Sequence, residues 1–206
     1  RYANDFVAIN NYCDRVRLMT YDQGAIDLRL NESAPGPYIP VADTKWVEKV
    51  VNLTAKNISK KKLVIGVATY GYEYKVTKLK EDGYRYNLLW AFNPRYALEL
   101  AAEIAIKPER NLAGELSFLY SPLASSAPPT DIILSNHTSI ATTSFSSELG
   151  QATTTNASAP FNIVWWSDAN AIKDKINLAK KLGVRGIAIF KIDGGEDPAM
   201  WDILKQ

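Results

Sequence analysis

Cysteine and histidine are almost absent from this sequence. Among its 206 residues there is one cysteine, Cys13, and one histidine, His137. A single cysteine cannot form a disulfide within the chain, and it excludes a cysteine-rich metal site. A single histidine in a polar stretch argues against a multi-histidine zinc site and against a Ser-His-Asp triad. We therefore expect no metal site and no cofactor.

Two further features are missing: an excess of charge of one sign and a long hydrophobic run. Lys and Arg number 24 and Asp and Glu 22, so the net charge is +2. Nucleic-acid-binding proteins usually carry a clustered basic excess, so this balance argues against a nucleic-acid partner. No apolar run reaches the roughly 18 residues that a membrane span needs. The remaining composition, 47% hydrophobic and 22% charged, is that of an ordinary folded protein.

Apolar strands alternate with amphipathic helices at both ends of the sequence. In the first part we expect a helix ending near residue 14, a strand over 16–21, a helix from Asp43 to about Asn57 and a strand over 63–70. In the last part we expect a strand over 162–166, a helix over 169–182 closed by Gly183, a strand over 187–192 and a helix over 198–204. This alternation is typical of a parallel α/β architecture.

The middle of the chain breaks the alternation. Residues 72–120 predict antiparallel strands and one helix from about Pro94 to Ala105, which together form a small α+β insertion. Of the 39 residues from Ser121 to Ala159, 16 are Ser or Thr, so this stretch predicts a long polar loop.

Polar and aromatic side chains follow the first two predicted parallel strands. Tyr21 and Asp22 end the first strand, where parallel α/β folds place ligand-binding groups. Asp22 could orient a reacting group or act as an acid or base, or it could be a helix cap. Tyr70, Tyr72 and Tyr74 follow the second strand on one face, and their rings suit sugars. The alternative is that these tyrosines form a half-buried strand face.

Two later segments hold further candidates for substrate contact. In the pair Trp165-Trp166, side chains on a strand alternate, so one ring belongs to the core and the other, Trp166 in our prediction, could stack on a ligand. Glu115 precedes the apolar stretch LSFLY and could reach a ligand groove, although a surface carboxylate is the simpler interpretation.

Four segments resemble parts of glycoside hydrolase family 18. Residues 19–22, MTYD, resemble the M-x-Y-D that ends the sixth barrel strand of that family. Residues 63–74, LVIGVATYGYEY, resemble its seventh strand and the Tyr-Gly pair. Residues 72–120 resemble its chitinase insertion domain, and residues 162–193 resemble its closing segment around strand eight. The resemblance covers nearly the whole chain except residues 121–160.

The fold that this resemblance implies is α/β: the C-terminal part of a TIM (β/α)8 barrel with an α+β chitinase insertion domain. Residues 1–71 would hold the barrel βα units of strands six and seven. Residues 72–164 would be the insertion, with its Ser/Thr-rich loop at 121–160, and residues 165–206 the last helix, strand and helix of the barrel. A closed barrel needs about 250 residues, so we expect only part of one.

The resemblance also implies an activity. The family cleaves β-1,4 bonds next to N-acetylglucosamine by a substrate-assisted retaining reaction, an exception to the two-carboxylate scheme. The acetamido oxygen of the sugar attacks the anomeric carbon, and a Glu of the enzyme protonates the leaving oxygen. Tyr21 and Asp22 would be the catalytic residues that hold the acetamido group, and Met19 and Tyr70 would line the same subsite. The substrate would be chitin or peptidoglycan, at an extracellular or cell-envelope location.

Several positions depart from the family pattern. The D-x-x-D-x-D-x-E motif, which supplies the acid Glu, is absent from this chain. Gly24 stands where many members have a His, and Tyr72 where many have an Arg. Phe190 replaces the Trp that usually carries the sugar, and Phe offers less area and no indole N–H. We therefore expect the chain alone to be inactive without the N-terminal half of the barrel, supplied in cis or by another chain.

Two alternative functions stay open at this point. The chain could belong to a non-catalytic, chitinase-like carbohydrate-binding protein, and the substitutions at Gly24 and Phe190 favour this. It could also be an interaction domain that binds a protein partner through the insertion and the Ser/Thr-rich loop. Either way, a partial barrel leaves strand edges and apolar surface uncovered, so we expect aggregation or association with another chain.

Overall fold

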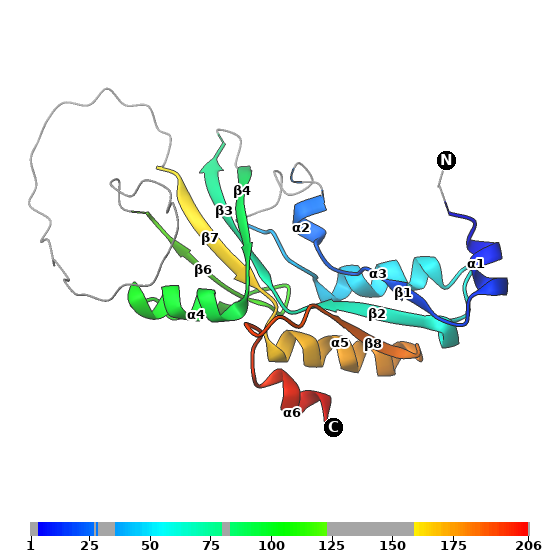
Figure 1. Cartoon of the computed structure of the whole chain (residues 1–206). Helices are drawn as coiled ribbons and strands as arrows, with labels where there is room; N and C mark the ends of the chain where they lie inside the picture. Colours follow the sequence, from blue (N-terminus) through cyan, green and yellow to red (C-terminus); the bar gives the residue numbers. More distant parts are fainter. Residues whose placement is uncertain (1–3, 27, 29–35, 80–82, 123–158, 206) are drawn as a thin grey trace, which may run out of the picture.

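The computed structural model describes residues 4–26, 28, 36–79, 83–122 and 159–205 (Figure 1). Most of the predicted Ser/Thr-rich loop at 121–160 lies outside these residues. In the described part the chain forms two sheets with helices packed against each (Figure 1). None of the helices in these ranges is both long and apolar enough to cross a membrane.

The first sheet contains three parallel strands in the order β1-β2-β8. They are β1 (Val16–Leu18), β2 (Leu63–Ala68) and β8 (Gly186–Phe190). Leu18 pairs with Ile65, and Ile65 pairs with Ile187, so the carboxyl ends of the strands lie at the same edge of the sheet. The predicted parallel α/β alternation is confirmed for these three strands.

The helices of this part are α1 (Phe6–Tyr12), α2 (Gln23–Ile26), α3 (Thr44–Thr54), the 3-10 turn η2 (Lys60–Lys62), α5 (Ala169–Leu182) and α6 (Met200–Leu204). The helix over 169–182 begins and ends at the predicted residues. The helix predicted from Asp43 to about Asn57 ends at Thr54, the helix predicted over 198–204 begins at Met200, and the short helix at 23–26 was not predicted. Asp43 and Asp168 accept backbone N–H groups at the starts of α3 and α5. Gly183 ends α5 with a φ of 67°, a left-handed conformation that favours glycine.

One face of the parallel sheet packs on the helices. On the opposite face the residues of β2 are buried as well, whereas Arg17 of β1 is exposed. Leu63, Ile65 and Val67 of β2 lie in an apolar cluster with residues of α3, α5 and α6. Side chains alternate along a strand, so Val64 points the other way, toward Arg17 of β1 in a shallow surface hollow.

The second sheet has five antiparallel strands in the order β4-β3-β7-β6-β5 (Figure 1). They are β3 (Gly71–Lys78), β4 (Tyr84–Phe92), β5 (Glu109–Arg110), β6 (Leu116–Tyr120) and β7 (Phe161–Trp166), and α4 (Pro94–Glu103) packs on one face. The antiparallel strands and helix predicted for residues 72–120 are confirmed. The strand over 162–166 is also found, but it belongs to this sheet and not to the parallel one. An apolar pattern predicts that a strand forms, but it does not predict which strands it pairs with.

Both faces of the antiparallel sheet are covered, which explains the nearly continuous apolar sequence of β7. Ile163 and Trp165 point into one core with Tyr74 and Val76. Val164 and Trp166 point into the other. Neither indole is therefore exposed.

A short link joins the two sheets and positions the site. The chain leaves β2 at Ala68 and enters β3 at Gly71, so that only Thr69 and Tyr70 lie between the sheets. The backbone N–H of Thr69 donates to the carbonyl of Phe190 at 3.0 Å, and that of Ser167 donates to the carbonyl of Tyr70 at 3.2 Å. The carboxyl ends of β2 and β8 are thereby held against the start of the antiparallel sheet.

Candidate functional site

Asp22 lies just beyond the carboxyl end of β1, at the start of the short helix α2. Its carbonyl accepts the N–H groups of Ala25 and Ile26, both at 3.0 Å. Its φ is 63°, in the left-handed region that aspartate tolerates better than most residues. This backbone conformation turns the chain between β1 and α2, and the carboxylate faces the link between the two sheets.

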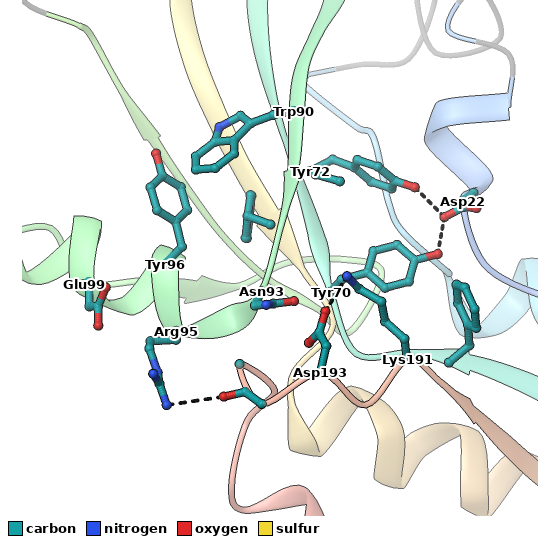
Figure 2. Close-up of a pocket in the computed structure, with 15 residues that line it drawn as sticks. Asp22, Tyr70, Tyr72, Trp90, Asn93, Arg95, Tyr96, Glu99, Lys191 and Asp193 are labelled. Atoms are coloured by element: carbon teal, nitrogen blue, oxygen red, sulfur yellow. Dashed lines mark hydrogen bonds and ion pairs between the residues drawn. The ribbon is translucent and has the colours of Figure 1, made fainter. Parts of the chain in front are cut away.

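Two tyrosine hydroxyls converge on one oxygen of Asp22. Tyr70 donates to Oδ1 at 2.5 Å and Tyr72 donates to the same atom at 2.6 Å (Figure 2). Burial, reinforced by the hydrogen bond to Asp22, raises the pKa of both tyrosines well above the ordinary value. Both hydroxyls therefore stay protonated as donors, and neither uses the other carboxylate oxygen, Oδ2.

Phe190 provides a flat apolar surface beside this carboxylate. Its ring stacks on Tyr21, with centroids 5.3 Å apart and an angle of 13° between the planes. It meets Tyr70 edge-on at 6.1 Å. Phe190 is 49% exposed, so part of its ring is open to a ligand. Burial, followed by the charge of Asp22, raises the pKa of Tyr21.

These residues form one side of a pocket of about 710 Å³, a size common for small-molecule sites. Asp22, Tyr70, Tyr72 and Phe190 line it together with groups from β4, α4 and the segment after β8. In Figure 2 the tyrosines point toward Asp22, and Trp90 and Tyr96 lie on the opposite side. The pocket thus spans the join between the two sheets.

The pocket carries charges of both signs. Lys191 forms an ion pair with Asp193, and this contact is the main cause of a lowered pKa at Asp193. Arg95 donates to the carbonyl of Gly194 at 3.3 Å. Within the described ranges, no three His, Cys, Asp or Glu residues gather in a way that could hold a metal ion.

The sequence model of a known family, "Glycosyl hydrolases family 18", matches residues 1–195. The chain belongs to glycosyl hydrolases family 18. It is 23% identical over 203 residues to the "Uncharacterized glycosylase YvbX" of Bacillus subtilis, covering 98% of this chain and 44% of the relative. The chain therefore spans less than half the length of that relative.

Solved structures of the same family share this fold. The spore cortex-lytic enzyme SleL of Bacillus cereus superposes with a TM-score of 0.64 at 22% identity, over 98% of this chain and 36% of SleL. A chitinase from Chromobacterium violaceum superposes with a TM-score of 0.61 at 19% identity, over 98% of this chain and 48% of the chitinase.

Four residues expected to contact substrate are not among those that line this pocket in the family 18 chain: Tyr21, Met19, Trp166 and Glu115. Tyr21 stacks on Phe190 without lining the pocket itself. Met19 is 76% exposed beyond the end of β1 and is not among the pocket residues. Trp166 is buried between Phe92 and Phe118, so it has no face for a ligand. The expectation of a stacking Trp166 is wrong because the sheet is covered on both faces.

Glu115 has a structural role instead of a ligand contact. It is fully buried, so the surface interpretation is wrong as well. Oε1 accepts the N–H of Ala42 at 2.8 Å, and Oε2 accepts the N–H of Val41 at 2.9 Å and the indole N–H of Trp165 at 2.7 Å. Burial raises the pKa of Glu115, and these donors with nearby Lys175 oppose the rise. The carboxylate joins the 41–42 segment to the antiparallel sheet.

Gly24, which stands where many family 18 members have a His, has no space for a side chain. A Cβ atom there would lie 2.5 Å from Cγ1 of Ile39 and 2.9 Å from its carbonyl carbon. The space that a His side chain would need at position 24 is occupied here by Ile39 and Pro40.

Sequence reasoning missed the far side of the pocket. Trp90, Arg95 and Tyr96 line it from β4 and α4, and Lys191 lines it from the segment after β8. The tryptophan in the strand YRYNLLWAF is a residue type that often binds ligands, so it could have been noticed in the sequence. Strand periodicity, however, does not tell which residue of an edge strand faces a pocket.

Proposed function

We propose that this chain is the C-terminal part of a glycosidase domain that hydrolyses β-1,4 linkages in polymers of N-acetylglucosamine, either chitin or peptidoglycan. The observation that carries the proposal is the carboxylate of Asp22. It lies at the carboxyl ends of parallel strands, at the rim of a pocket, with two tyrosine hydroxyls on one oxygen.

The open parallel sheet supports the assignment of strands. β1, β2 and β8 would be strands six, seven and eight of a TIM barrel, and each outer strand pairs with only one described strand. A closed barrel has no such edges. The antiparallel sheet with α4 would be the insertion domain. We place its borders at Gly71 and Trp166, which pair with each other, close to the limits of 72 and 164 expected from sequence.

In the proposed reaction the acetamido oxygen of the substrate attacks the anomeric carbon of its own sugar while the glycosidic C–O bond breaks. Water then attacks the same carbon, releases the acetamido oxygen and completes the hydrolysis. Asp22 accepts a hydrogen bond from the acetamido N–H and stabilises the positive charge that develops on this group. Tyr70 and Tyr72 fix the carboxylate, since their hydroxyls occupy Oδ1. The exposed ring of Phe190 carries the apolar face of the sugar.

The proton for the leaving oxygen would come from a Glu outside this chain. The remaining part of the barrel, in cis or as another chain, would supply that residue and pair with the outer strands β1 and β8 of the parallel sheet. We place the whole protein in the extracellular space or cell envelope, where polymers of this kind occur.

The test of this proposal is the substitution Asp22→Asn in the full-length protein. Turnover of an N-acetylglucosamine oligomer should fall by about 100-fold or more, because a preorganised charge beside the reacting group is removed. Asp14→Asn is the matched control, because Asp14 is exposed and absent from the pocket.

Equal turnover of the two variants would contradict the assigned role of Asp22. The second candidate function is non-catalytic sugar binding, which the substitution of Trp by Phe at position 190 favours. In that case the full-length protein binds the oligomer without cleaving it, and Asp22→Asn weakens binding.

A further inference from the structure

Glu73 is a buried carboxylate with four hydrogen-bond donors. It lies on β3 and is 3% exposed. Oε2 accepts the indole N–H of Trp90 at 2.7 Å and the hydroxyl of Tyr96 at 3.1 Å. Oε1 accepts the amide of Asn162 at 2.7 Å and the hydroxyl of Tyr120. Among the described residues no Lys or Arg forms an ion pair with it.

The four donors divide into two pairs with different surroundings. Asn162 and Tyr120 lie on β7 and β6, inside the sheet and outside the pocket. Trp90 and Tyr96 line the pocket from β4 and α4. Leaving a buried carboxylate without hydrogen bonds costs folding free energy. The fold is therefore most stable when all four donors stay in their positions around Glu73. Glu73 thus ties one wall of the pocket to the middle of the sheet.

A β-bulge sets the position of Trp90. Glu73 pairs with Trp90 and Tyr74 pairs with Leu88, so Leu89 is an extra residue on β4. A bulge shifts the side chains that follow it, and bulges are frequent next to functional sites. Here the residue after the bulge is the one whose indole reaches Glu73.

The wall built in this way is an exposed aromatic surface. Trp90 is 43% exposed although its polar N–H is bonded inside, so its open part is the apolar ring. Tyr96 meets it edge-on with centroids 4.3 Å apart. Such rigid aromatic faces suit the C–H faces of sugars. Figure 2 shows this pair on the opposite side of the pocket from Asp22.

We propose that Trp90 and Tyr96 form a second sugar-binding surface of the pocket, and that Glu73 is its positioning residue. This inference rests on the proposed function, because a glycan is the ligand that would extend from Asp22 to the aromatic pair. A short oligomer held at Asp22 and Phe190 would not need this surface, whereas a longer one would contact both sides.

The experiment is a calorimetric titration of the full-length protein with N-acetylglucosamine oligomers of two and five units. Trp90→Ala should weaken binding of the five-unit oligomer about tenfold and leave the two-unit oligomer unchanged. Leu88→Ala is the matched control, an exposed apolar residue of the same strand that lies outside the pocket. It should change neither affinity.

The outcomes separate this inference from the proposed function. Equal effects of Trp90→Ala and Leu88→Ala, with normal wild-type binding, would overturn the second surface and leave the proposed function standing. If the wild-type full-length protein binds neither oligomer, the proposed function is contradicted and this inference falls with it.

The positioning role of Glu73 has its own readout. Glu73→Gln should shift the NMR signal of the Trp90 indole N–H and weaken only the five-unit oligomer. Tyr120→Phe removes a donor to the same carboxylate from outside the pocket, so it should lower the Tm without changing either affinity. If Glu73→Gln changes the Tm alone, Glu73 is purely structural.

Discussion

At the scale of single residues, the sequence predicted those side chains whose place follows from strand ends. Asp22 and Tyr70 could be found because they follow apolar runs, and carboxyl ends of parallel strands meet at one edge. Tyr72 followed from strand alternation. Trp166 and Glu115 were misassigned because the residues that bury them lie far away in the sequence, so the local pattern does not reveal their burial. The role of Glu73 was missed because its four donors come from three strands and a helix.

Tyr120 gives a prediction about pH. Burial, then the hydrogen bond to Glu73, raises the pKa of Tyr120 to about 12. The unfolded value is about 10, so the protonated hydroxyl stabilises the fold fully below pH 10. That contribution is lost as the pH rises from 10 to 12. Urea unfolding between pH 9 and 12 should therefore show a smaller decline for Tyr120→Phe than for wild type. Parallel declines would contradict the hydrogen bond.

At the scale of elements, the apolar patterns gave the helices and strands but not all of their partners. The helix over 169–182 was predicted with its cap and its closing glycine, since both signals are local. The alternation of strands and helices by itself grouped the strand over 162–166 with the parallel strands, because its sequence resembles any strand covered on both faces. In the structure it pairs with β3 of the antiparallel sheet. Asp168 connects the two parts of the fold. It caps α5, which packs on the parallel sheet, and it accepts two hydrogen bonds from Arg110 of β5 in the antiparallel sheet.

Gly71 is the element-scale test of the join between the sheets. A Cβ atom at this position would lie 2.3 Å from the carbonyl oxygen of Trp165 and 2.4 Å from Cβ of Trp166. Gly71→Ala should lower the free energy of unfolding by about 1–3 kcal/mol, since backbone and not a flexible side chain has to move. Lys75→Ala, at an exposed position of the same strand, is the control. Similar urea midpoints for the two variants would refute this close approach.

At the scale of the whole molecule, the parallel sheet has unpaired strand edges with exposed apolar side chains nearby, as protein interfaces often do. The parallel sheet ends in β1 on one side and β8 on the other, and apolar side chains near their carboxyl ends are exposed. These are Met19, Phe190 and Ile192. That the chain forms only part of a barrel was an expectation from its length and remains part of our proposal. Which apolar residues are exposed could be learned only from the three-dimensional arrangement.

This surface predicts that the isolated chain associates with itself. Unpaired strand edges and exposed apolar side chains favour contacts between copies. Sedimentation velocity at increasing protein concentration should show a rising weight-average mass. The double substitution Met19→Ser and Ile192→Ser should reduce the effect. A monodisperse monomer at all concentrations would show that the edges are protected in some other way.

Tyr72 and Glu73 are consecutive residues of one strand and point to opposite faces of the sheet. The first holds Asp22, and the second holds Trp90 and Tyr96. The anchors of the two sides of the pocket are therefore one peptide unit apart, about 3.8 Å between Cα atoms, a length fixed by covalent geometry. The backbone positions of the two anchors cannot move apart, because one peptide unit joins them. Under the proposed function, we therefore expect the chain to distinguish glycans by the spacing of their sugar rings.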